Sequence, residues 1–166
     1  MPVVEAALRK ELVVPVEDNA VGSAGVELRH KMEIEVGRLL DSEFRWTNAR
    51  FAMAREALSD LSILGTNWDS YGGAAPSHRS VQNASRILDL LQSLDFAPAR
   101  VLPSAEGGVG VCFVSRERYA DIECSNDGEI LGVYYVGMQM PRLLEVDGTD
   151  ESITAALERI REHITR

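Results

Sequence analysis

Two carboxylates lie two residues apart, at Asp121 and Glu123, in a segment where polar and apolar residues alternate. In a β-strand this spacing puts both side chains on one face, where they could begin a site for a divalent cation. Asp69 is a further acid, in a glycine-rich loop. A metal-dependent hydrolase using Asp69 or the Asp121/Glu123 pair is therefore one hypothesis. A solvated outer sheet face explains the alternation equally well, and the oxygen ligands are too few, so we expect no metal site.

Nucleophilic catalysis would need Cys112 or Cys124 beside one of the three histidines, His30, His78 and His163. The histidines lie in separate helical segments, and no strained nucleophile turn or activating helix start flanks either cysteine. The two cysteines form no CxxC pair, so we expect free thiols. P-loop, dinucleotide-binding, HExxH and zinc-type spacings are also missing from the sequence. We therefore expect no catalytic residue and no cofactor.

The most distinctive segment is the loop at residues 67–76, which reads Asn-Trp-Asp-Ser-Tyr-Gly-Gly-Ala-Ala-Pro. It uses two large aromatic residues, Trp68 and Tyr71, in a chain with 2 Trp and 4 Tyr. One interpretation is that both rings pack on the neighbouring helices while Asp69 accepts hydrogen bonds from loop amides. The other is that the rings frame a recognition pocket with Asp69 as its polar anchor. Trp68, Asp69 and Tyr71 are thus the candidate partner- or ligand-binding residues.

The elements around this loop follow from hydrophobic periodicity. Residues 26–64 repeat apolar positions every three to four residues, which predicts helix, and we favour two helices that meet near Asp41. A second helical segment begins at Ser77, which follows a proline and can cap the free amides. After Arg100 the pattern changes to short β segments with a hairpin turn at residues 126–128, and a last helix follows Gly148.

This order predicts an α+β fold: N-terminal helices packed on a three- to four-stranded antiparallel β-meander, closed by a C-terminal helix. We expect residues 1–40 to form an N-terminal arm and helical extension. Residues 41–166 are expected to form a single α+β domain.

The loop and the later turns also carry a resemblance. The matching positions are residues 67–76, Pro103, Gly107, Gly108, Asp121 and residues 126–128. On these positions the chain resembles a widespread, largely uncharacterised family of short bacterial proteins with an Asn-Trp-Asp-Ser/Gly-Tyr-Gly-Ala-x-Pro loop. The resemblance implies an α+β fold and a bacterial source, and it brings no established reaction.

Composition narrows the functional classes. The chain has 166 residues and a net charge of −9, which makes direct binding to a phosphate backbone unlikely. No apolar run approaches the length of a membrane span, and the N-terminus does not resemble a secretory signal, so we expect a cytoplasmic protein that does not bind membranes. The leading hypothesis is a non-catalytic interaction or accessory protein of a bacterial operon, such as a toxin-neutralising or defence-associated partner. It would bind another protein, or itself, through the N-terminal arm and helix, with the apolar stretches at residues 13–16 and 138–141 as further surfaces.

Overall fold

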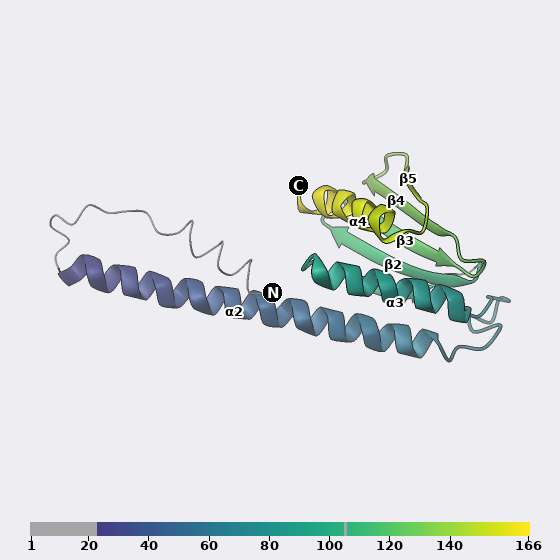
Figure 1. Ribbon diagram of the computed structural model, residues 1–166, viewed down its shortest axis with the longest axis horizontal. Coiled ribbons are helices and arrows are strands. Elements are labelled where there is room, and N and C mark those ends of the chain that lie inside the picture. Colours follow the sequence, from purple (N-terminus) through teal and green to yellow (C-terminus); the bar gives the residue numbers. More distant parts are fainter. Residues whose placement is uncertain (1–22, 105) are drawn as a thin grey trace. The chain divides into compact units, whose positions relative to one another are not determined.

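The computed structural model describes residues 23–104 and 106–166 (Figure 1). The predicted N-terminal arm, with its apolar stretch at residues 13–16, lies outside the described residues. The chain divides into two units, residues 1–42 and residues 43–166. Each unit is described by itself below.

The second unit contains one antiparallel sheet with the strand order β1-β2-β3-β4-β5. Its strands are β1 (Arg100–Pro103), β2 (Gly108–Ser115), β3 (Arg118–Ser125), β4 (Ile130–Val136) and β5 (Arg142–Val146). The predicted count of three to four strands was wrong, because β5 was missed. This edge strand has five residues and a single buried side chain, Leu144, so its sequence carries little of the alternation from which strands are recognised.

The described residues form three helices, α2 (Ser23–Leu61), α3 (His78–Ser93) and α4 (Asp150–Thr165). With the sheet they make the predicted α+β fold. The prediction of two helices meeting near Asp41 was wrong, because α2 continues through that position. Gly37 and Ser42 are weak helix formers, but each costs only about 0.5–1 kcal/mol, and the Ser42 hydroxyl is satisfied by donating to the Leu39 carbonyl at 2.8 Å.

The core of the second unit lies between one face of the sheet and the helices α3 and α4, which both pack on that face (Figure 1). Fully buried side chains such as Leu88 of α3, Ile122 of β3 and Leu157 of α4 fill it. The part of α2 within this unit adds a row of buried apolar residues, Phe51, Ala54, Leu58 and Leu61. These residues recur every three to four positions, so only one face of this part of α2 is used for packing.

The helical residues of the first unit have no such buried face. Every described side chain from Leu28 to Asp41 is exposed. None of the helices in the described residues is both long and apolar enough for a membrane span.

Candidate functional site

The loop at residues 67–76 is closed by its own hydrogen bonds. The Asn67 amide donates to the Gly73 carbonyl at 2.8 Å, and the Gly72 amide donates to Asn67 Oδ1 at 2.8 Å. Gly72 has a φ of 93°, which side chains other than glycine rarely adopt. The loop conformation is therefore fixed locally, between α2 and α3.

Asp69 holds the tip of this loop. Its Oδ1 accepts hydrogen bonds from the amides of Tyr71 at 2.9 Å and Gly73 at 2.8 Å. These two amides stabilise the charged form and lower the pKa of the carboxyl below its usual value. A Cβ at Gly73 would lie 2.8 Å from the Asp69 carboxyl carbon, so this contact requires glycine. The Asp69 carboxylate is thus engaged by its own loop.

The two aromatic side chains of the loop differ in how far they are exposed. Trp68 is half-buried, and its Nε1 donates to the Ala74 carbonyl at 3.2 Å, as the packing interpretation predicted. Tyr71 is 94% exposed, so its predicted packing was wrong: the Asp69 cap holds the backbone with this side chain turned outward. Tyr71 is therefore the member of the candidate trio that is available for contact.

Asn126, in the turn between β3 and β4, ties that turn to the loop. Its Oδ1 accepts from the Ser77 amide at 2.6 Å and the Ser80 hydroxyl at 3.1 Å. Its Nδ2 donates to the Ala75 carbonyl at 2.9 Å. A Cβ at Gly107 would come within 2.4 Å of Asn126 Nδ2, so the turn before β2 must also be glycine here. We call residues 67–77, Gly107 and Asn126 the loop–hairpin junction.

The sequence analysis treated Asn126 only as a turn residue and missed its role at the start of α3. It makes these contacts to residues about 50 positions earlier. The sequence signal that could have pointed to this role is the predicted resemblance, whose matching positions include residues 67–76, Gly107 and residues 126–128. The structure brings these segments into one hydrogen-bonded cluster.

The two carboxylates of the hydrolase hypothesis lie on β3. Asp121 is half-buried and pairs in register with Cys112 of β2, while Glu123 is two residues further along the same strand face. Among the described residues, no group of three or more His, Cys, Asp or Glu side chains is placed to hold a metal ion. Asp69 and the Asp121/Glu123 pair are therefore not brought together as one metal-binding group.

Both cysteines are free thiols. Burial raises the pKa of Cys112 to about 12, and a hydrogen bond to Asp121 and its charge add to the effect. Burial also raises the pKa of Cys124 to about 12. A thiol is a nucleophile as the thiolate, so neither residue is activated. The histidines do not change this, since His163 Nε2 lies 3.0 Å from the Tyr135 carbonyl and His78 is exposed in the first turn of α3.

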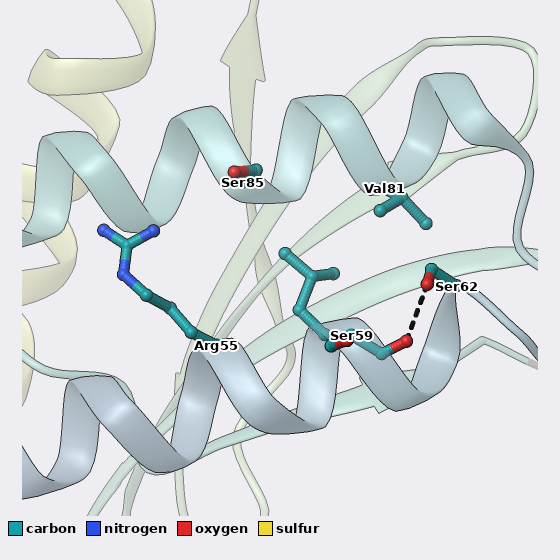
Figure 2. A pocket seen from close by; sticks show the side chains of 6 residues that line it. Arg55, Ser59, Ser62, Val81 and Ser85 are labelled. Carbon is teal, nitrogen blue, oxygen red and sulfur yellow. Dashed lines mark hydrogen bonds between the residues drawn. The ribbon is translucent and has the colours of Figure 1, made fainter.

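Two shallow pockets lie in the second unit. The one between α2 and α3 has a volume of about 240 Å³ and is lined by Arg55, Leu58, Ser59, Ser62, Val81 and Ser85. Figure 2 shows Arg55 extending from α2 toward α3, where it donates to Asp89 and Gln92, each at 2.8 Å. The lining of this pocket therefore provides serine hydroxyls and the guanidinium of Arg55, which already has hydrogen-bond partners. It places no base beside a nucleophile.

The second pocket, of about 370 Å³, lies between β4, the start of β5 and the end of α4. Its lining includes Arg142, Arg159 and His163, with one acid, Glu162. Glu162 lies 3.9 Å from Arg166. This pocket is a basic notch on an otherwise acidic chain, and its single acid lies beside a basic side chain.

A different feature is the apolar surface of α2. Leu28, Met32, Val36 and Leu39 recur every three to four residues in the first unit and are 61, 61, 37 and 57% exposed. This spacing puts the four side chains on one face of the part of α2 that belongs to the first unit, and we call this face the α2 stripe. The stripe is distinct from the buried row that begins at Phe51.

The chain matches no known family profile, no curated protein and no solved structure. The resemblance to short bacterial proteins thus stays a prediction. The α2 stripe, the loop–hairpin junction and the basic notch are the features on which a functional argument can be based.

Proposed function

We propose that the protein is a non-catalytic interaction protein and that its partner binds along the α2 stripe. The observation that carries this proposal is that every described side chain from Leu28 to Asp41 is exposed, including the large apolar side chains of Leu28, Met32 and Leu39. A helix in a globular protein gains most of its stability from packing an apolar face. An apolar face without such packing is typical of a surface that binds another chain.

The size of the effect favours the stripe over isolated exposed residues. Full burial of a Val, Leu or Met side chain is worth about 1.5–3 kcal/mol, and the four stripe residues still expose between 37 and 61% of their surface. Each one could therefore contribute about 1–2 kcal/mol when it is covered. Four residues in one row make these contributions available to a single partner helix, which is the arrangement that coiled-coil pairing uses.

The enzyme alternative has less support. The Asp69 carboxylate is occupied by two loop amides, and the thiols of Cys112 and Cys124 have pKa values raised to about 12. No observation on the described residues favours a metal-dependent hydrolase using Asp69 or the Asp121/Glu123 pair.

The proposal extends to the setting in which the protein acts. Free thiols at Cys112 and Cys124 fit a reducing compartment, so we place the protein in the bacterial cytoplasm. There it serves as an accessory protein of an operon, such as a toxin-neutralising or defence-associated partner. Its net charge of −9 supports a protein partner over a nucleic acid.

The test compares charge substitutions on two faces of α2. Tagged full-length protein is expressed at a low level in a bacterial host, and the native mass of its complexes is measured. Met32→Asp and Leu39→Asp should abolish a stoichiometric complex, because each would bury a charge in the contact with the partner. Ile34→Asp is the matched control, since Ile34 is also exposed, at 44%, but lies on another side of α2. A complex that survives both stripe substitutions, or a wild-type chain that forms no complex, would refute the proposal.

A further inference from the structure

The basic notch between β4, the start of β5 and the end of α4 is lined only by residues of the second unit. We infer that it is a binding site for a small phosphate monoester, whose phosphate is held by the arginines and whose organic group lies on the apolar wall. This inference concerns a surface other than the α2 stripe. It goes beyond the proposed function, and neither depends on the other.

Arginine side chains reach the notch from two elements. Arg159 and Arg166 are seven residues apart on α4, which is close to two helical turns and places both on one side of the helix. Arg142 is the first residue of β5 and pairs in register with Tyr134 of β4, so these two side chains lie on one face of the sheet. Leu144, two residues further along β5, is buried on that face. The three guanidinium groups therefore line one pocket of about 370 Å³.

The charges in the notch are not balanced by its own side chains. In the part of the chain that the structure describes, the guanidinium groups of Arg142 and Arg159 have no hydrogen bond or ion pair. Arg166 lies 3.9 Å from Glu162, and both side chains are largely exposed, so this ion pair is weak. Three guanidinium groups and one carboxylate leave two positive charges in the lining without a counter-ion. A phosphate monoester carries about −1.5 to −2 charges at pH 7, which matches this excess.

The chemistry of arginine also favours phosphate over carboxylate. A planar guanidinium donates two parallel hydrogen bonds to a pair of phosphate oxygens. The three terminal oxygens of a phosphate monoester give more than one guanidinium an acceptor, whereas a carboxylate has two oxygens and a single charge. The net charge of −9 repels a long polyanion such as a nucleic acid. A small ligand that fits inside the notch is therefore favoured.

An apolar wall next to the arginines provides the place for the organic group. Tyr134, Val136 and Met140 line the same pocket. The Tyr134 ring packs on His163 with 5.0 Å between the ring centroids, and His163 Nε2 lies 3.0 Å from the Tyr135 carbonyl, so this part of the wall is held in place. Met140 is 87% exposed, and its flexible thioether side chain can adapt to a ligand. Ligand pockets have volumes of about 300–1,000 Å³, so the notch suits an organic group of the size of one ring.

Calorimetric titration of the full-length chain at neutral pH and low salt tests the inference with three probes. Phenyl phosphate should bind with a Kd below about 1 mM. Phenyl sulfate has the same ring but a single charge, so it should bind at least about fivefold more weakly. Inorganic phosphate lacks the ring and should bind about tenfold more weakly. No binding of phenyl phosphate at about 10 mM would overturn the inference, and equal binding of either other probe would overturn the assignment to a phosphate monoester.

Substitution of the arginines locates the site. Arg142→Gln and Arg159→Gln should each weaken the binding of phenyl phosphate by about tenfold or more, because each removes a charge-assisted hydrogen bond. Arg100→Gln is the matched control, since Arg100 is also exposed but lies on β1, at the opposite edge of the sheet. It should bind as the wild type does. All three side chains are exposed, so the variants should keep the fold. An equal loss in all three variants would show nonspecific attraction and overturn the inference.

Two further measurements need no variant. Amide chemical shifts of the wild-type chain should change on addition of phenyl phosphate at Val136, Arg142 and His163, while those of the loop–hairpin junction stay unchanged. Shift changes that leave out the notch would overturn the inference. A peptide that carries phosphotyrosine presents the same aryl phosphate on a larger molecule, and it should bind no more tightly than phenyl phosphate. Binding of this peptide more than about tenfold tighter would assign the notch to a modified protein and overturn the small-molecule assignment.

Discussion

Replacing Asn126 by alanine should destabilise the second unit. Asn126 Oδ1 accepts hydrogen bonds from the Ser77 amide and the Ser80 hydroxyl, and its Nδ2 donates to the Ala75 carbonyl. The Ser80 hydroxyl also has the Ser77 carbonyl as an acceptor, at 2.8 Å, so its single proton is shared. The variant loses two full hydrogen bonds and one shared bond, which lowers the free energy of unfolding by about 2–3 kcal/mol at about 1 kcal/mol for each bond.

This loss translates into a measurable shift of the melting temperature. For a domain of this size, 1 kcal/mol corresponds to about 4 °C, so Asn126→Ala should melt about 8–12 °C below the wild type. The matched control is Asp127→Ala in the same turn. Asp127 is exposed and accepts one hydrogen bond, from the Glu129 amide at 3.0 Å, so this variant should lose less than about 4 °C.

Calorimetry or circular dichroism on the three proteins at equal concentration gives the comparison. Asn126→Asp adds a diagnostic variant, since it keeps the acceptor but turns the donor toward Ala75 into a second acceptor. It should also destabilise the unit. If Asn126→Ala melts within about 2 °C of Asp127→Ala, the loop–hairpin junction does not hold the start of α3.

Three further outcomes are expected. In urea unfolding, Trp68→Phe should lower the free energy of unfolding by about 1 kcal/mol, because the indole hydrogen bond is lost. Tyr71→Ala should change the free energy of unfolding by less than about 0.5 kcal/mol, because Tyr71 is exposed. A larger loss for Tyr71→Ala would contradict the loop geometry. At pH 8 a thiol reagent should label Cys112 and Cys124 only after denaturation, because their pKa values are raised to about 12, and rapid labelling of the folded chain would refute their burial. Because the pKa of Asp69 is lowered in the folded chain, the stability that this carboxylate contributes is present above its unfolded-state pKa and is lost as the pH falls through the folded pKa. Asp69→Asn should therefore reduce the loss of stability between pH 7 and pH 3. An unchanged pH profile of stability would argue against the amide contacts.

The sequence allowed the fold class to be predicted because its strongest signals are local. The helix start at Ser77 and the hairpin turn at residues 126–128 are set by capping and turn chemistry within a few residues, and both are present. The continuity of α2 was not predictable in the same way, since Gly37 and Ser42 only weaken a helix. Edge strand β5 was missed because it buries a single side chain.

The candidate site was less predictable because it depends on contacts between distant segments. The loop glycines and Asp69 indicated a tight turn, but sequence alone does not determine which aromatic side chain turns outward. Only the hydrogen bonds of the folded loop distinguish the half-buried Trp68 from the exposed Tyr71. The partner of Asn126 is likewise set by tertiary packing, about 50 residues away.

Amide hydrogen exchange over residues 28–41 tests the central claim, that α2 is a binding surface, most directly. A helical segment of this length without packing is marginally stable, so in a monomer its amides should exchange at nearly the rates of an unfolded chain. We predict protection of these amides in complexes isolated from cells; this protection is lost in Leu39→Asp, while Ile34→Asp keeps it. Rapid exchange of residues 28–41 in those complexes would contradict the account.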